Sequence, residues 1–212
     1  MYLKSLAFST DLIRNCSVSR RSLFDSSSKG ETIGPKDYEQ GVIEHPEAFW
    51  SALWDFTGGV AGRKPDQVLQ EGDNMPGARW FTGARLNFAE NLLRFRDEQA
   101  ALIFRGEDGD EWCLSYLELF EQSARVATAL AARGIGPGDR VAAILPNIPE
   151  AVIGMLATTW VGAVWSSCSP DFGVRGVLDR FQRIRPAVLF AADGYFYGGR
   201  WFSSIEKVAG IA

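Results

Sequence analysis

A run of small polar residues from Ser166 to Asp171 is the first place in this sequence to look for chemistry. It follows an apolar run of strand length, so it falls at the carboxyl end of a predicted strand, where ligands bind in open α/β sheets. Cys168 has no histidine near it in the sequence, and a catalytic thiol needs such a base or another positive environment. We expect Ser169 or Asp171 to cap the helix that follows; the alternative is direct contact with a substrate.

The familiar nucleotide-binding and hydrolase motifs are missing from the 212 residues. A glycine-rich loop gathers backbone N–H groups on a phosphate, but neither G-x-x-x-x-G-K-[ST] nor G-x-G-x-x-G after a strand occurs. The G-x-S-x-G turn of α/β-hydrolases is missing too. His45 is the only histidine, and Cys16, Cys113 and Cys168 form no C-x-x-C pair. The sequence therefore predicts no catalytic residue, no metal ligand and no disulfide framework.

The charge and the cysteine content exclude further classes of function. The net charge is −4, which gives no general affinity for nucleic acid or for an anionic membrane. Three widely spaced cysteines, odd in number, favour a reducing compartment, so we expect a cytoplasmic protein. The arginines at 175, 180 and 183 lie at helical spacing, and we interpret them as a solvated helix face rather than a phosphate site.

The chain is organised around a predicted βαβ unit. Apolar strands at 141–145 and 163–167 flank a helix at 149–161, and a further helix (173–185) leads to a third strand (187–191). This alternation predicts an α/β fold that begins a doubly wound, mainly parallel sheet. The uncharged run 151–168 has the minimum length of a membrane span, but threonines, serines and a glycine dilute it, so we expect no span.

The remaining segments are predicted from local patterns. Residues 1–36 are basic and rich in serine, which predicts a poorly ordered tail, and residues 37–95 predict a helical cap without strands. In this cap we expect one helix that begins at Pro46 and a second helix over residues 86–94. The second helix should direct Leu86, Ala89, Leu92 and Leu93 towards the core. A hairpin (101–104 with 111–114) should precede a helix that begins at a Ser115–Glu118 capping box. We expect this helix to bury Leu117, Phe120, Ala124, Ala127 and either Leu130 or Ala131. Residues 193–200 are expected to form a loop before a helix at 201–208.

Five motifs in order resemble those of one enzyme family. They are MPGARWF, GARLNFAENLL, LPNIPEAVIGMLA, GAVWSSCSPDFGVRGVLDRF and VLFAADGY. They closely resemble the acetoacetyl-CoA synthetases (acetoacetate–CoA ligases), members of the acyl-adenylate-forming ligase superfamily. The resemblance extends from about Pro46 to Gly199. It implies that residues 37–95 are the N-terminal cap of an acyl-CoA synthetase and that residues 96–212 begin its AMP-binding (adenylation) domain.

The resemblance also implies a set of ligands. The parent enzymes join acetoacetate to CoA through an acyl-adenylate, with ATP and Mg²⁺. Their ATP loop, acyl pocket and C-terminal domain follow the region that matches this chain. Basic residues in the loop that matches 193–200 contact the nucleotide phosphate of CoA, which implies CoA contacts at Tyr197, Gly199 and Arg200. Phe196 stands where an arginine is expected.

We therefore expect the N-terminal portion of an acetoacetate–CoA ligase, truncated and inactive by itself. Without the ATP loop and the C-terminal domain, no ligand should bind these residues tightly. The alternative is a non-catalytic interaction or regulatory module derived from an acyl-CoA synthetase. In either case, we expect the chain to associate with the missing remainder of a ligase or with itself, because a short parallel sheet leaves its edge strands unpaired.

Overall fold

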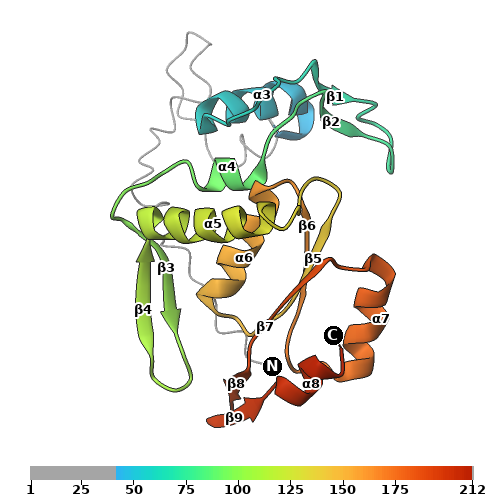
Figure 1. Cartoon of the computed structure of the whole chain (residues 1–212). Coiled ribbons are helices and arrows are strands. Elements are labelled where there is room, and N and C mark those ends of the chain that lie inside the picture. The colour runs from blue at the N-terminus through green and yellow to red at the C-terminus, as the bar shows by residue number, and fades with distance from the viewer. Residues whose placement is uncertain (1–41, 212) are drawn as a thin grey trace. The chain divides into compact units, whose positions relative to one another are not determined.

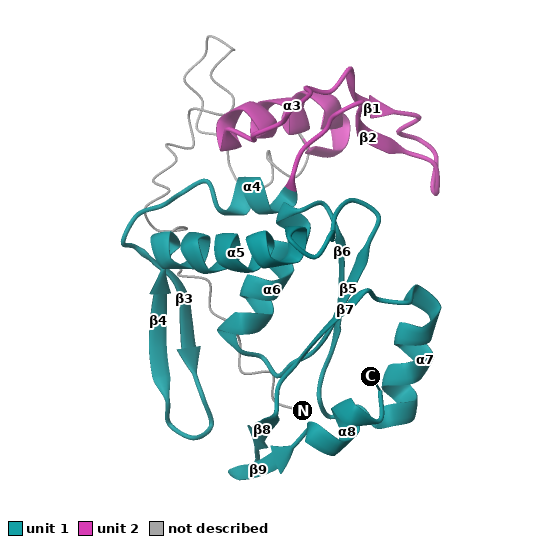
Figure 2. Cartoon of the chain, in the orientation of Figure 1, with its two compact units in different colours: residues 1–10, 88–212 teal, residues 11–87 magenta. Residues whose placement is uncertain are grey.

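The structure is a computed structural model that describes residues 42–211. The predicted tail at 1–36 lies outside the described residues. The described chain divides into two compact units, with the boundary between residues 87 and 88 (Figure 2). Each unit is considered by itself below.

A three-stranded parallel sheet forms the centre of the larger unit (Figure 1). Its strands are β5 (Arg140–Ile144), β6 (Val164–Cys168) and β7 (Val188–Ala191), in the order β6-β5-β7. Helix α6 (Pro149–Trp160) connects β5 to β6, and α7 (Val174–Ile184) connects β6 to β7. Because the two crossovers lead to opposite sides of β5, right-handed connections place their helices on opposite faces of the sheet. The predicted doubly wound α/β fold is confirmed.

Strand β5 is buried on both faces from Val141 to Ile144, which explains why these four residues are all apolar. Val141 packs in a cluster with Ala157 of α6, and Ala142 and Ile144 pack with Phe181 of α7. Successive side chains of a strand point to opposite faces, so β5 contributes to two cores at once. The run that the sequence analysis compared with a membrane span is divided between α6 and β6. Among the described residues, no helix has the length and apolarity needed to cross a membrane.

The predicted hairpin and capped helix are both present. Strands β3 (Ala100–Arg105) and β4 (Glu111–Ser115) pair antiparallel and lead into α5 (Tyr116–Ala131). The Ser115 hydroxyl accepts from the Glu118 N–H at 3.2 Å, and the Glu118 carboxylate accepts from the Ser115 N–H at 2.8 Å. This is the predicted capping box.

The buried face of α5 was predicted only in part. Ala127 and Leu130 are buried as expected, but the other buried residues of the helix are Leu119 and Ser123. Leu117, Phe120 and Ala124 are only partly buried. The polar Ser123 belongs to the buried face, and a pattern that follows apolar residues alone does not include it, so the predicted stripe was displaced.

Two short hairpins were not predicted. Strands β1 (Gln67–Gln70) and β2 (Arg79–Thr82) pair in the smaller unit, so the prediction of a strand-free cap is wrong. Strands β8 (Gly194–Tyr197) and β9 (Arg200–Ser203) pair in the larger unit, where a loop and the start of a helix were expected. The last helix is α8 (Ile205–Ala209). In β1, β2 and β9 two apolar residues stand side by side between polar ones, and β8 is aromatic after its glycine, so none has the alternating pattern of a half-buried strand.

The smaller unit packs through aromatic side chains. Helix α3 (Pro46–Thr57) begins at Pro46, as predicted, and Gly58 is its C-cap residue. Trp50 lies 5.7 Å from Trp80, and Trp54 lies 4.9 Å from Phe81, ring centroid to ring centroid. These pairs join α3 to the β1–β2 hairpin.

Helix α4 (Phe88–Leu92) opens the larger unit and is shorter than predicted. Ala89 and Leu93 are buried as expected, but Leu86 and Leu92 are exposed. Leu86 precedes the helix, and a helix of five residues is too short to present the predicted stripe on one side.

Candidate functional site

The carboxyl ends of the three parallel strands meet at one edge of the sheet. Ile144 pairs in register with Cys168 on one side and with Ala191 on the other. The chain leaves β5 towards β6 and then crosses to β7, so the connections change direction at β5. Ligands of doubly wound sheets bind at such a point. The segments that follow Cys168 and Ala191 are therefore the first candidates for a functional site.

Ser169 and Asp171 lie at this edge, but neither caps α7. The cap position is Gly173, and no side chain accepts a hydrogen bond there. Ser169 instead accepts the N–H of Asp171 at 3.3 Å, and Asp171 forms a side-chain hydrogen bond with Tyr195 of β8. The capping prediction is wrong because Asp171 lies two residues before the cap. Burial raises the pKa of the Tyr195 hydroxyl, and the Asp171 carboxylate raises it further.

Cys168 ends β6 in a buried position among Ala142, Val177 and Phe181. Burial raises the pKa of its thiol, although the positive charges of Arg180 and Lys207 act in the opposite direction. The ammonium group of Lys207 is itself engaged, since it donates to the Pro170 carbonyl. A buried thiol with a raised pKa is protonated near neutral pH and does not act as a nucleophile.

The structure brings Tyr197, Gly199 and Arg200 together at the tip of the β8–β9 hairpin. Tyr197 pairs with Arg200 across the hairpin, and Gly198 and Gly199 form the two-residue turn with φ values of 59° and 73°. Glycine adopts such angles without strain, and two of them favour the turn that matches strand twist. All three predicted residues are exposed, Tyr197 to 57%. Their assignment to CoA remains a prediction.

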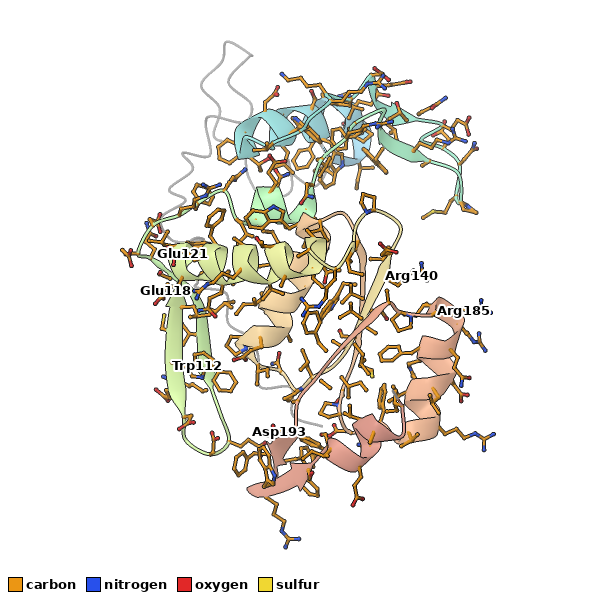
Figure 3. All side chains as sticks on the ribbon, viewed as in Figure 1. Trp112, Glu118, Glu121, Arg140, Arg185 and Asp193 are labelled. Carbon is orange, nitrogen blue, oxygen red and sulfur yellow. The ribbon has the colours of Figure 1, made fainter. Side chains whose placement is uncertain are left out.

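Aromatic pairs link the two strands of the hairpin. Tyr195 stacks on Phe202 at 5.6 Å, and Phe196, which stands where an arginine is expected, packs edge-on against Trp201 at 5.1 Å. Gly194 is buried, and a Cβ there would overlap the Trp201 ring. At the base of the hairpin the Asp193 carbonyl accepts the Ser204 N–H at 2.7 Å, and Figure 3 shows Asp193 where β7 passes into β8.

One residue of this site was not predicted from the sequence. Glu107, in the turn between β3 and β4, accepts the Gly199 N–H through its Oε2 at 3.3 Å. The two residues are separated by 92 positions, so no local pattern connects them. An acidic stretch at the turn was visible in the sequence, but such a stretch is usual on a solvated turn.

The described residues do not assemble a metal centre. Between residues 42 and 211, no group of three or more His, Cys, Asp or Glu side chains is arranged to hold a metal ion.

Comparison with known proteins defines the class. The model of the AMP-binding enzyme family matches residues 88–209, and that of the acetyl-coenzyme A synthetase N-terminus matches residues 36–92. The first match covers more than half of the chain, and the chain belongs to the AMP-binding enzyme family.

Several individual relatives are named acetoacetyl-CoA synthetases. The acetoacetyl-coenzyme A synthetase of Rhizobium meliloti (strain 1021) is 52% identical over 165 residues, which are 78% of this chain and 25% of the relative. The acetoacetyl-CoA synthetase of Macaca fascicularis is 40% identical over 175 residues, 81% of this chain and 26% of the relative. The solved acetoacetyl-CoA synthetase from Streptomyces lividans superposes with a TM-score of 0.79 at 40% identity, over 88% of this chain and 29% of that one.

These matches confirm the resemblance to acetoacetyl-CoA synthetases that the motifs indicated. The chain spans about a quarter of the length of the curated relatives it matches.

Proposed function

We propose that this chain forms the N-terminal part of an acetoacetate–CoA ligase, which converts ATP, acetoacetate and CoA to acetoacetyl-CoA, AMP and pyrophosphate. The observation that carries the proposal is the 52% identity to the Rhizobium meliloti synthetase, over 78% of this chain. The solved relative supports it with a similar fold, at a TM-score of 0.79 and 40% identity. We further propose that residues 37–95 serve as the cap of the ligase and that residues 96–212 begin its adenylation domain.

The β8–β9 turn is the proposed contact with CoA. Arg200 supplies a positive charge, Gly199 a backbone donor and Tyr197 an exposed aromatic ring beside them. An anion is best held by charge-assisted hydrogen bonds from such groups. One contact of this kind contributes about 1.5–3 kcal/mol. A millimolar complex requires roughly 4 kcal/mol. The contact therefore adds to a larger CoA site and binds CoA only weakly by itself.

Formation of the acyl-adenylate requires groups that these 212 residues do not contain. The carboxylate must be held in line with the α-phosphate while negative charge on the phosphoryl oxygens is stabilised. No glycine-rich phosphate loop occurs in the sequence; at the carboxyl edge of the sheet the Cys168 thiol is buried and the Asp171 carboxylate is hydrogen-bonded to Tyr195. We propose that the chain positions part of CoA and does not form the adenylate alone.

A segment exchange tests the proposal. Residues 36–209 of this chain replace the matching segment of the Rhizobium meliloti synthetase, and formation of acetoacetyl-CoA is measured. We expect the hybrid to keep acetoacetate-dependent activity. The variant Arg200→Ala should raise its KM for CoA roughly tenfold, the effect of losing one charge-assisted contact. Arg175→Ala, which removes an equal charge on the exposed face of α7, should leave KM unchanged.

Two results would contradict the proposal. A folded hybrid without acetoacetate-dependent activity would show that the segment does not belong to such a ligase. Acetoacetate-dependent pyrophosphate exchange by the purified 212-residue chain, above the background without enzyme, would show that adenylation chemistry lies within these residues.

A further inference from the structure

The turn that contacts Gly199 is unusually acidic. Residues 107–111 read Glu-Asp-Gly-Asp-Glu and connect β3 to β4. Two of its carboxylates are engaged locally, since Asp108 accepts the Asp110 N–H at 3.2 Å and Glu111 pairs with Arg105 at 3.1 Å. Glu107 instead reaches across to the β8–β9 turn and accepts the Gly199 N–H.

The Gly199 N–H lies in a setting suited to an anion. It is at the tip of a hairpin, in a left-handed conformation, with the guanidinium-bearing Arg200 next in the chain. Backbone N–H groups in such turns, together with a cation, form anion-binding concavities. In this structure the anion at the Gly199 N–H is the Glu107 carboxylate, 3.3 Å away.

We propose that Glu107 is an internal competitor of phosphate at this turn. Its carboxylate holds the donor that a phosphate of CoA would use, and it must turn away when the phosphate binds. The inference rests on the proposed function, because it takes the phosphate to be that of CoA. Glu107 thus lowers the affinity of the turn for phosphate, which can bind the Gly199 N–H only after the Glu107 side chain has moved away.

The expected size of the effect follows from the exposure of the groups. Glu107, Gly199 and Arg200 are all at the surface, where water and salt weaken charge interactions. A like charge at contact distance in water weakens binding roughly fivefold. Removing the charge of Glu107 should therefore tighten the binding of CoA about fivefold at low salt, and less at high salt.

Hydrogen–deuterium exchange with mass spectrometry tests this on the hybrid synthetase described above, at micromolar concentration, because the rest of its CoA site allows a millimolar ligand to bind. Protection of the peptide that spans residues 194–203 is followed against millimolar CoA and against pantetheine, which carries no phosphate. Glu107→Gln keeps an acceptor oxygen but no charge, so it should protect this peptide at about fivefold lower CoA than wild type does. Asp110→Asn removes the same charge from the same turn without touching Gly199 and should change the midpoint less than twofold.

The readouts separate this inference from the proposed function. Equal CoA midpoints for wild type and Glu107→Gln, with weaker binding by Arg200→Ala, would overturn the role of Glu107 and leave the CoA contact in place. No protection by CoA in any variant would overturn both. If Glu107→Gln lowered the midpoint for pantetheine as much as that for CoA, the substitution would have loosened the turn in general, and the inference would also be overturned. Without ligand, Glu107→Ala should speed exchange in this peptide; an unchanged rate would show that the contact does not exist.

Discussion

At the scale of single residues, burial sets the reactivity of the thiols. Cys113 is exposed on β4, whereas Cys168 is buried at the end of β6 with a raised pKa. The thiolate is the reactive form, and its fraction falls about tenfold for each unit by which a pKa rises. We expect a maleimide at pH 7.5 to label Cys113 at least about tenfold faster than Cys168, measured by peptide mass spectrometry.

The same experiment contains its own control. Cys16 lies outside the described residues and is replaced by serine. In urea the two remaining thiols should react at similar rates, because unfolding removes the burial that raises the pKa of Cys168. Labelling of Cys168 as fast as Cys113 in the folded chain would contradict the buried position of this thiol.

From the sequence, only those residues of the candidate site that are close to one another along the chain could be predicted. Tyr197, Gly199 and Arg200 are close in sequence, so their proximity required no tertiary information. Glu107 could not be found this way, because its contact with Gly199 depends on how two distant hairpins meet. Asp171 was assigned to a helix cap because an acidic residue just before a helix usually caps it, but its partner is Tyr195.

At the scale of elements, Arg140 closes the end of α7. Its Nε donates to the Ile184 carbonyl and one terminal nitrogen donates to the Arg185 carbonyl, each at 2.7 Å, while the other donates to Gly138 at 3.1 Å. Figure 3 labels Arg140 and Arg185 in this region. The last carbonyls of a helix have no partner within it, and a positive charge there is favourable. We expect Arg140→Gln to lower the free energy of unfolding by about 1.5–3 kcal/mol.

Urea unfolding followed by circular dichroism measures this effect. Arg140→Lys should recover less than half of the loss, because an ammonium group lacks the planar fork that reaches several carbonyls. Arg175→Ala removes the same charge from the exposed face of α7 and should change stability by less than about 0.5 kcal/mol. Equal losses for Arg140→Gln and Arg175→Ala would indicate an effect of net charge and not of the cap.

The elements that the sequence predicted well are those with long or redundant patterns. Strand β5 is apolar from Val141 to Ile144, α6 begins at Pro149, and α5 has both members of its capping box. The β1–β2 and β8–β9 hairpins were missed because their strands do not alternate apolar and polar residues, although Gly198-Gly199 was a usable indication of a turn. The stripe of α5 was predicted only in part because the polar Ser123 belongs to the buried face, and a pattern of apolar residues does not include it.

At the scale of the whole molecule, exposed apolar surface of the larger unit determines how the chain behaves when expressed by itself. In the described residues β6 and β7 are the outer strands of a three-stranded sheet, and Val164 on β6 is 54% exposed. All four residues of β9 are exposed, Trp201 and Phe202 among them. An unpaired strand edge offers N–H and C=O groups to another copy, and large apolar patches favour association.

We therefore expect the purified 212-residue chain to associate, with a mass in light scattering that rises with concentration across the micromolar range. Val164→Lys places a charge on the outer strand and should lower the average mass, since lysine on an edge opposes strand pairing. Ile205→Lys makes the same kind of change on α8, where Ile205 is 62% exposed, and should lower it less. A monomeric wild type with a sharp reversible melt would contradict association. Equal effects of the two variants would show that apolar area, and not the strand edge, drives it.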